Sequence, residues 1–413
     1  TTLKAADHSS VGVEQFVDFE HASDFAVECL EPSSSPEFIG RLGDIDIQEI
    51  IGHGGMGVVL KGYQSELKRL VAVKVLAPQL AVSAAARKRF AREAQATAAI
   101  LHPNVMPILT VNSSGRLPYI VMPYVACESL QQRIDRCGTL ELVDILRISM
   151  QTANGLAAAH AQGLVHRDVK PANILLEIGV EKVMLTDFGL ARAIDDASIT
   201  RTGIIAGTPL YMSPEQSRGE PVDARSDLFS LGSVLYTLAT GRTPFRAEST
   251  YGILRRLSED TPRRVREISP QLPAWFEMIV HKLLAKSPGD RFASAIEVAQ
   301  LLEGCLAHVQ QPASVPLPAE CAACVKPRWF LMSLSFAAIS VCIFGGWWAL
   351  NQRPQDAPLE TTTDHSTTAN PETDWDAGEQ EVAPLRTDFN EWNTNAEKLW
   401  EDVPKQFGTA NER

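Results

Sequence analysis

The stretch His166-Arg167-Asp168-Val169-Lys170-Pro171-Ala172-Asn173 decides the fold of this chain of 413 residues. A run of helical composition precedes it, and an apolar run of strand length follows it at residues 174–176. The stretch is therefore a loop between two rigid elements, where catalytic groups are often placed. Phosphoryl transfer needs a carboxylate to orient a hydroxyl, a cation and an oxygen ligand for a metal ion, and Asp168, Lys170 and Asn173 offer these three. A charged surface loop would explain any one of these residues but explains the set poorly.

A glycine-rich segment, Gly52-His53-Gly54-Gly55-Met56-Gly57, follows a predicted strand over residues 45–51. Glycines let a backbone approach phosphate groups closely. In a dinucleotide-binding fold a helix would come next, with an acidic residue about 20 positions further on. Here two β-rich runs come next instead, at residues 58–63 and 70–76. No Gly-Lys-Ser/Thr ends the segment, so the pattern also excludes a Walker A loop.

Lys74 lies at the centre of the second β-rich run. A lysine in an apolar strand is costly unless a carboxylate pairs with it. The next element is predicted to be a helix from the N-cap Ser83 to Ile100. Glu93 shares one face of this helix with Thr97 and Ile100. The spacing predicts a Lys74–Glu93 ion pair, and an exposed Glu93 that pairs on the surface is the alternative.

Asp187-Phe188-Gly189 follows a predicted apolar strand over residues 183–186. An aspartate at a strand end is often part of a plain turn. This one comes after a glycine-rich segment and an Asp-x-x-x-x-Asn loop, in the order that nucleotide-dependent phosphotransferases use. The joint pattern predicts that Asp187 binds one Mg²⁺ and that Asn173 binds a second.

Together these motifs resemble those of the eukaryotic-like (Hanks-type) serine/threonine protein kinases of bacteria, and in particular the membrane-anchored type. The resemblance covers residues 44–306. It implies an α+β fold with two lobes, a small β-rich lobe and a large α-rich lobe. Lys170, two residues after Asp168, and Thr208 in Gly207-Thr208-Pro209 resemble the serine/threonine branch of the family rather than the tyrosine branch.

The resemblance implies an enzyme that transfers the γ-phosphate of ATP to Ser or Thr of protein substrates, with Mg²⁺ as cofactor. Asp168 would receive or orient the proton of the substrate hydroxyl, and Lys170 would contact the γ-phosphate. Lys74 and its partner Glu93 would complete the catalytic set. Asp187 would hold the metal together with the loop asparagine described above.

The glycine-rich segment, the lysine strand and the connection between the lobes would bind ATP. Met122 would gate the back pocket, and the backbone of Tyr124 and Val125 would contact adenine. Pro123 stands where the family commonly has glutamate, and it has no N–H to donate. The full predicted ATP-binding set is Ile51, Gly52, His53, Gly54, Gly55, Met56, Gly57, Val58, Val59, Ala72, Lys74, Met122, Tyr124 and Val125.

Residues 187–215 show no clear periodicity and resemble an activation segment. A phosphate can order such a loop when it meets a cation, and the resemblance makes Arg167 its partner. We expect autophosphorylation at Thr200 and Thr202, with unmodified threonines as the alternative. One copy of the chain could phosphorylate another within a homodimer, and the sequence does not decide between this and transfer within one copy.

Three further charges resemble structural residues of the family. Glu215, in Ser213-Pro214-Glu215, would pair with Arg291 and close the large lobe. Asp227 would brace the backbone of the catalytic loop.

The composition limits the other functions of the chain. Its apolar fraction of 45% is ample for a core, while a net charge of −12 and a pI near 5.3 argue against a nucleic-acid surface. The seven cysteines are scattered, which suits a reduced compartment. Cys321-Ala322-Ala323-Cys324 has the spacing of a metal or redox half-site. We find no second ligand pair for it in a Pro-rich linker, which favours chance spacing.

Residues 329–350 are 22 residues without a charge. This length can cross the hydrocarbon layer of a membrane, which is roughly 30 Å thick. Trp329 at one end and Trp347-Trp348 at the other suit the two interfaces. A buried helix of a soluble domain is the alternative. Lys326 and Arg328 precede the span, so positive-inside reasoning places the kinase on the cytoplasmic side of the cell membrane.

The remaining segments are predicted from composition. Residues 1–43 form an acidic leader, partly disordered and without a signal peptide. Residues 307–328 form a juxtamembrane linker, and residues 351–413 form an acidic tail that is mostly disordered.

Two rival functions remain. A membrane-tethered pseudokinase would serve as a scaffold without catalysis, but Lys74, Asp168 and Asp187 are all present. A phosphotransferase for small molecules is disfavoured by the long segment with Gly-Thr-Pro and Ser-Pro-Glu, which in the family serves peptide docking.

Overall fold

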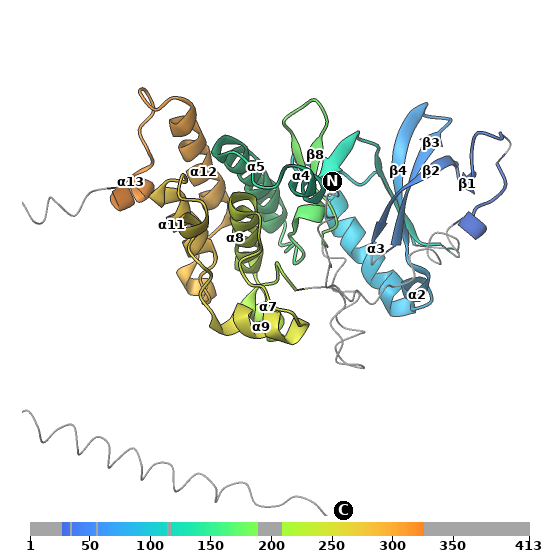
Figure 1. Ribbon diagram of the computed structural model, residues 1–413. Helices are drawn as coiled ribbons and strands as arrows, with labels where there is room; N and C mark the ends of the chain where they lie inside the picture. The colour runs from blue at the N-terminus through green and yellow to red at the C-terminus, as the bar shows by residue number, and fades with distance from the viewer. Residues whose placement is uncertain are drawn as a thin grey trace, which may run out of the picture. The chain divides into compact units, whose positions relative to one another are not determined.

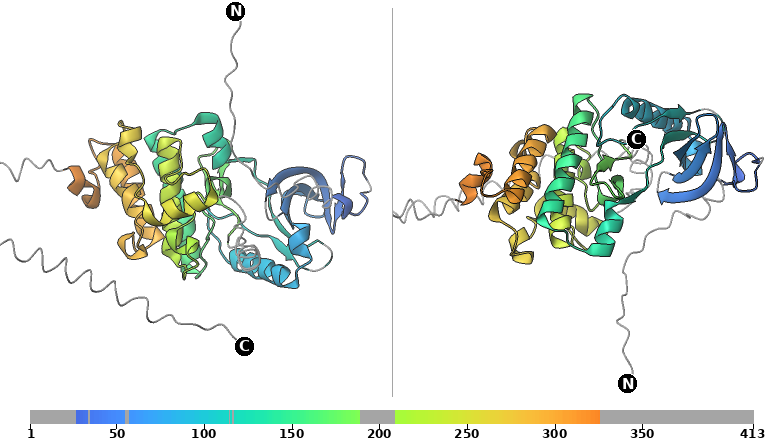
Figure 2. Two further views of the ribbon diagram at one scale, coloured as in Figure 1. Left: turned by 60° about the horizontal axis from the view of Figure 1, so that its bottom comes forward. Right: turned by 90° about the horizontal axis from the view of Figure 1, so that it is seen from above.

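The computed structural model describes residues 27–33, 35–54, 57–113, 115, 117–188 and 209–325. These residues form two lobes, one built around a β-sheet and one built of helices (Figures 1 and 2). The predicted membrane span, most of the acidic leader, the C-terminal tail and the greater part of the activation segment lie outside the described residues.

The small lobe contains a six-stranded antiparallel sheet in the order β1-β2-β3-β4-β6-β5. The strands are β1 (Gly40–Leu42), β2 (Ile45–Gly54), β3 (Gly57–Gln64), β4 (Arg69–Leu76), β5 (Thr110–Asn112) and β6 (Tyr119–Pro123), and two helices follow β4, α2 (Pro78–Ala81) and α3 (Ala84–Ala98). The predicted strands on both sides of the glycine-rich segment are confirmed.

Strand β4 has the alternation that places Lys74 on the functional face. Val71, Val73 and Val75 are buried in the core of the small lobe. Because successive side chains of a strand point to opposite faces, Ala72 and Lys74 face the other way, where α3 lies. Helix α3 begins where the sequence predicts, with the side chain of Ser83 accepting a hydrogen bond from the backbone N–H of its third residue at 3.2 Å.

The large lobe is built around helix α8 (Ala224–Thr240), which is buried from Ser226 to its last residue. Figure 1 shows α8 in the middle of this lobe, where it contacts α5 (Leu142–Ala161) and α11 (Ala274–Leu283). The other helices are α4 (Leu130–Cys137), α7 (Pro214–Ser217), α9 (Thr250–Glu259), α10 (Val265–Ile268), α12 (Ala295–Gln310) and α13 (Ala319–Val325), with 3₁₀ turns η1 (Pro171–Asn173) and η2 (Pro288–Asp290). The strands β7 (Cys127–Ser129), β8 (Ile174–Glu177) and β9 (Val183–Leu185) form a small sheet, and β8 begins directly after the catalytic loop.

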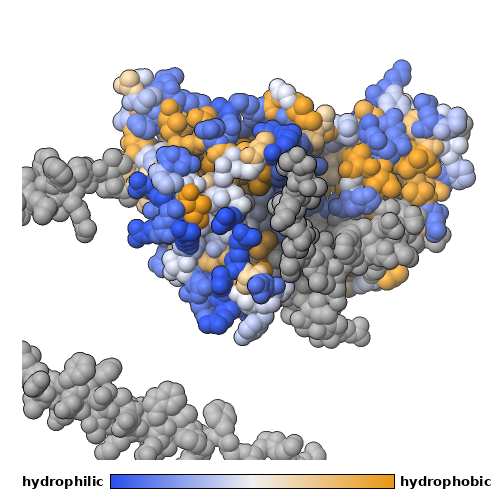
Figure 3. Space-filling model, in the orientation of Figure 1, coloured by the Kyte–Doolittle hydropathy of each residue, from blue (hydrophilic) through white to orange (hydrophobic). Residues whose placement is uncertain are grey.

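One described helix has the length and apolar composition of a membrane span, Pro288–Gln310, which consists mainly of α12. Helix α12 buries Val298, Leu302 and Cys305 in the core of the large lobe and packs against α5. On the face in Figure 3, hydrophilic and hydrophobic side chains of this lobe are interspersed. Helix α12 is therefore a core helix of the lobe.

An ion pair between Glu215 and Arg291 joins two distant parts of the large lobe, as the sequence predicts. The two Nη atoms of Arg291 donate to the two carboxylate oxygens of Glu215 at 2.7 and 2.8 Å. The Ser226 hydroxyl donates to the same carboxylate at 2.5 Å. Burial would raise the pKa of Glu215, but the hydrogen bonds from Arg291 and Ser226 lower the pKa to about 2.

Replacing Arg291 by methionine is expected to destabilise the large lobe. The change leaves a buried carboxylate without its cation, which typically costs about 3–5 kcal/mol. The folded-state pKa of Glu215 lies below its ordinary value of 4.5. The stability from this pair is therefore fully present above that value and is lost as the pH falls toward about 2. Denaturant titration of wild type and R291M at several pH values measures both effects.

R263M is the matched control, because Arg263 pairs with Glu267 on the surface at 3.0 Å with both side chains more than half exposed. It is expected to change the unfolding free energy little. Equal stability of R291M and R263M at neutral pH would contradict the role of the buried pair.

Candidate active site

The backbone of the catalytic loop is held by Asp227 at the start of α8. Its buried carboxylate accepts hydrogen bonds from the N–H groups of His166 at 2.8 Å and Arg167 at 2.7 Å, and His160 Nε2 lies 2.7 Å away. Arg167 has φ of 67°, a left-handed conformation that costs energy in a non-glycine residue. The two hydrogen bonds stabilise it. The predicted bracing role of Asp227 is confirmed.

His166 connects this loop to the end of β9. Its Nε2 donates to the carbonyl of Thr186 at 3.0 Å, and its Nδ1 accepts from the N–H of Asp168 at 3.3 Å. The His166 ring also lies 4.4 Å from the ring of Phe188, centroid to centroid. The buried imidazole thus fixes Asp168 relative to the segment that contains Asp187.

Asp168, Lys170 and Asn173 come together as the sequence predicts. The Lys170 Nζ lies 2.8 Å from Asp168 Oδ2. Asn173 Nδ2 donates to the same oxygen at 3.0 Å and to the carbonyl of Asp168 at 2.8 Å. The Asp168 side chain keeps 24% of its surface exposed. The Asp168 carboxylate is therefore held in one orientation beside a cation, and a substrate hydroxyl can reach it.

Asp187 lies just after β9 and has a φ of 67°. Its Oδ1 pairs with Lys74 Nζ at 2.6 Å. Burial would raise the pKa of Asp187, but the charge of Lys74 and its hydrogen bond hold the pKa below the ordinary value. The carboxylate is thus ionised at neutral pH, the form that binds metal ions.

The ion pair of Lys74 differs from the sequence prediction, which gave Glu93 as its partner. In this conformation Lys74 pairs with Asp187. A narrow cavity of about 20 Å³ lies between β4 and α3, lined by Lys74, Thr97 and Asp187 among others. Helical spacing identifies the face on which Glu93 lies but not the distance between α3 and β4. The role of Glu93 in catalysis stays a prediction.

Four predicted ATP-binding residues share one face of the sheet. Val59 is directly opposite Lys74, and Ala72 is directly opposite Met122. Residues opposite each other in an antiparallel pair point to the same face. The side chain of Val58, a further member of the predicted set, is buried in the core on the other face. Only its backbone can contact a ligand on the face of Lys74.

The turn between β2 and β3 requires glycine at its last position. Gly57 has a φ of +146°, and a Cβ there would lie 1.8 Å from the carbonyl oxygen of Val75. At Gly52 a Cβ would meet its nearest neighbour at an ordinary 3.7 Å. Ile51, His53 and the backbone of Gly54 belong to the same hairpin. Gly55 and Met56 lie outside the described residues.

The connection between the lobes begins at the end of β6. The Tyr124 N–H donates to the carbonyl of Leu70 at 3.4 Å, so it takes part in the pairing of the sheet. Lys61 lies over the Tyr124 ring, 5.1 Å from its centroid. Val125 follows beyond the strand and is the better placed of the two predicted hinge residues to offer its N–H to a ligand.

Arg167, the predicted phosphate partner, has a side-chain nitrogen that is available to a phosphate. Its Nε is buried and has no hydrogen-bond partner among the described residues. Its carbonyl accepts from Gln216 Nε2 at 2.8 Å. Gln216 is not among the residues predicted from the sequence, although Ser213 and Gln216 form a capping box at the start of α7. Thr200 and Thr202 lie outside the described residues.

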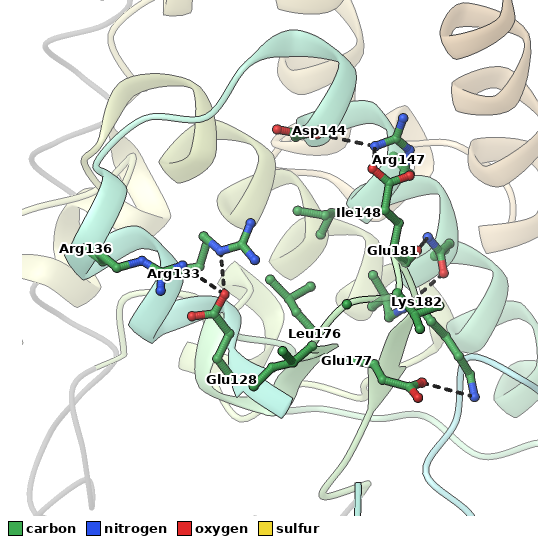
Figure 4. A pocket seen from close by; sticks show the side chains of 15 residues that line it. Glu128, Arg133, Arg136, Asp144, Arg147, Ile148, Leu176, Glu177, Glu181 and Lys182 are labelled. Carbon is green, nitrogen blue, oxygen red and sulfur yellow. Dashed lines mark hydrogen bonds and ion pairs between the residues drawn. The ribbon is translucent and has the colours of Figure 1, made fainter. Parts of the chain in front are cut away.

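A larger hollow of about 490 Å³ lies between α4, α5 and the β8–β9 turn (Figure 4). Its charges pair with one another: Glu128 with Arg133 and Arg136, and Arg147 with Glu181. It contains none of the predicted catalytic residues, so the cluster around Asp168 remains the candidate active site.

Comparisons with known proteins agree with this geometry. Residues 45–305 match the sequence profile of the protein kinase domain. The chain is 40% identical over 267 residues to a "Probable serine/threonine-protein kinase PknB" of Bifidobacterium longum, which covers 62% of this chain and 38% of that protein. It is 38% identical over 277 residues to the "Serine/threonine-protein kinase PknB" of Mycobacterium leprae, covering 66% of this chain and 44% of that protein. The chain thus spans about two fifths of the length of these curated relatives.

The fold is also similar to that of a solved structure. The crystal structure of the Mycobacterium tuberculosis PknI kinase domain superposes with a TM-score of 0.53 at 29% identity, covering 66% of this chain and 99% of that one. The two described lobes therefore have the protein kinase fold, as the sequence predicts.

Proposed function

Because this chain belongs to the protein kinase family, we propose that it is an active serine/threonine kinase that transfers the γ-phosphate of ATP to protein substrates. One observation carries this proposal: Lys170 and Asn173 both hold the Asp168 carboxylate, at 2.8 and 3.0 Å. The names of the PknB relatives, which are serine/threonine-protein kinases, support the choice of substrate residue.

Asp168 orients the hydroxyl of the substrate and accepts its proton as the phosphate bond forms. General base catalysis of this kind contributes about 10²–10⁴-fold to a rate. Lys170 pairs with the Oδ2 atom of Asp168. Its positive charge therefore lies beside the substrate hydroxyl oxygen to which the phosphate is transferred. The buried His166 and Asp227 keep this pair in position.

Asp187 and Asn173 offer an ionised carboxylate and an amide oxygen, the hard ligands that suit Mg²⁺. They would hold the metal, which neutralises the charge of the phosphate oxygens when bound. Lys74, now paired with Asp187, lies on the same side and would contact the phosphates of ATP. Glu93 would then take over as the partner of Lys74, which is the ion pair predicted from the sequence.

D168N is expected to lower kcat by about 10²–10⁴-fold, because the variant keeps the shape of the side chain but loses the base. Its affinity for ATP should be little changed, since Asp168 faces the hydroxyl. K74M is the contrasting variant and should weaken ATP binding as well as transfer. The measurement is the incorporation of labelled γ-phosphate into a generic protein substrate, together with ATP binding by calorimetry.

The same assay separates the rival functions. Wild type that binds ATP but transfers no more phosphate than D168N would identify a pseudokinase scaffold. Transfer to a small alcohol or amine but not to protein would identify a small-molecule phosphotransferase. Either result would contradict the proposed function.

The state of Arg167 supports regulation by autophosphorylation at Thr200 and Thr202. Its backbone is fixed on both sides, by Asp227 and by Gln216, and its buried Nε has no acceptor among the described residues. A phosphothreonine would supply a charged acceptor for this nitrogen and order the segment around it.

After incubation with ATP, peptide mass spectrometry is expected to find phosphate on Thr200 and Thr202 in wild type and none in D168N. T200V/T202V should have the low activity of phosphatase-treated wild type, and R167M should make activity insensitive to phosphatase. Equal phosphate in D168N would exclude autophosphorylation. An initial rate that rises with the square of the protein concentration would indicate transfer in trans within a transient homodimer.

The chain is proposed to be a single-pass protein of the cell membrane, with residues 329–350 as the span. The kinase lies on the cytoplasmic side, because ATP is there and because Lys326 and Arg328 precede the span. The apolar composition of helix α12 is explained by its burial in the large lobe.

The double variant I339K/F344K is expected to release the protein from membranes at alkaline pH, where wild type stays in the pellet. Each lysine near the centre of a span costs about 2.5–3.5 kcal/mol of insertion free energy. I296K is the matched control, since Ile296 lies 48% exposed on α12, and it should leave membrane association unchanged. Release of I296K but not of the double variant would place the span in α12 instead.

A further inference from the structure

One side chain joins the start of α7 to the catalytic loop. Gln216 Oε1 accepts a hydrogen bond from the backbone N–H of Ser213 at 3.0 Å, and Gln216 Nε2 donates to the carbonyl oxygen of Arg167 at 2.8 Å. These two partners fix the orientation of the amide, because a flipped amide would set a donor against a donor and an acceptor against an acceptor. Gln216 therefore binds two separate backbone segments at once, one through its acceptor and one through its donor.

The carbonyl that Gln216 binds belongs to the peptide unit between Arg167 and Asp168. A peptide unit is planar, so its carbonyl and its N–H can only turn together. The N–H of this unit, which is that of Asp168, donates to His166 Nδ1 at 3.3 Å. The unit is thus held at both edges, by Gln216 on one side and by His166 on the other. Its plane determines the direction in which the Asp168 side chain leaves the backbone.

The position of Gln216 is fixed by its neighbour in sequence. Glu215 is buried and accepts hydrogen bonds from both Nη atoms of Arg291 at 2.7 and 2.8 Å. A shift of α7 would break this buried pair, which is costly. A continuous series of contacts therefore leads from the ion pair of the large lobe, through Gln216 and the carbonyl of Arg167, to Asp168.

We infer that Gln216 is a positioning residue for phosphoryl transfer, which acts through the Arg167–Asp168 peptide unit on the Asp168 carboxylate. Arg167 has a left-handed φ of 67°, and such a conformation persists only where its surroundings hold it. Gln216 holds it from the side opposite to its N–H, which Asp227 binds at 2.7 Å. The inference rests on the proposed kinase activity, because it assigns Gln216 a part in that reaction.

Helix α4 provides an internal comparison, because it begins with the same capping box. Gln132 Oε1 accepts from the backbone N–H of Ser129 at 2.8 Å, as Gln216 Oε1 does from Ser213. Within the described part of the chain, no acceptor binds the Nε2 of Gln132. The two glutamines thus have the same role in their caps and differ in the hydrogen bond to the catalytic loop.

The test compares Q216E with Q132E in the full chain. A glutamate keeps the acceptor that a capping box needs, so both variants keep their caps. Q216E loses the donor to Arg167 and sets a carboxylate oxygen against the carbonyl, which turns the peptide unit. Its kcat is expected to fall about 10–100-fold, because a small misplacement can cost about 10²-fold in rate. Its KM for ATP and its unfolding midpoint should be unchanged, and Q132E should equal wild type in all three measurements.

A double-mutant cycle with D168N separates positioning from a merely structural role. D168N lacks the base, so the direction of its side chain no longer matters for proton transfer. Q216E should therefore leave the residual rate of D168N unchanged, measured in single turnovers with enzyme in excess. A loss by the same factor in both backgrounds would overturn the inference, and so would a wild-type kcat in Q216E.

A second pair of variants, Q216M and Q132M, adds no charge and decides the question if Q216E does not fold. Both variants lose the acceptor of the cap, and Q216M alone also loses the bond to Arg167. A fall of kcat in Q216M but not in Q132M supports the inference, and equal values overturn it. Wild type that transfers no phosphate would overturn the proposed function and the inference with it. Active wild type with equally active Q216 variants would overturn the inference alone.

Discussion

The catalytic loop depends on one buried carboxylate. Asp227 has no exposed surface, and an ionised group in that position is very costly unless its oxygens are fully hydrogen-bonded. The donors that satisfy it include the backbone N–H groups of His166 and Arg167. These hydrogen bonds therefore fix the loop backbone, including the left-handed conformation of Arg167. Asp168 is the next residue, so its direction follows from a helix that begins almost 60 residues downstream in sequence.

A second constraint concerns Lys74, whose charge is also nearly buried. Such a cation must always have an anionic partner, and the site offers Asp187, Glu93 and, in a complex, the phosphates of ATP. In the structure it pairs with Asp187. An exchange of partners costs little when one pair replaces another in the same low-dielectric place, whereas a lysine without a partner would cost several kcal/mol. In the proposed complex with ATP, an exchange from Asp187 to Glu93 would couple the position of α3 to the nucleotide.

The sequence was sufficient for the fold and for the residues around Asp168, because these depend on order and short spacing within single elements. The sequence did not predict contacts that depend on the distance between separate helices and strands. Alternation along β3 shows only that Val58 and Val59 point to opposite faces. The pairing of Val59 with Lys74 is needed to show that Val58 is the one in the core. Gln216 lies far in sequence from its contact, the carbonyl of Arg167, and no local pattern measures how α7 meets the catalytic loop.

Among the described residues, hydropathy alone would select a core helix of the large lobe as a membrane span. The segment Pro288–Gln310 passes by length and composition, but it carries Glu297 and Glu303, which a bilayer would have to accommodate. In the folded lobe this is no difficulty, since Glu303 is exposed and the Glu297 carboxylate accepts the backbone N–H of Ala293 at 2.7 Å. Residues 329–350 contain no charged side chain. A helix whose carboxylates reach water while its opposite face is buried is a surface helix of a lobe, whereas a sequence segment without any charge has no side chain that excludes it from lipid.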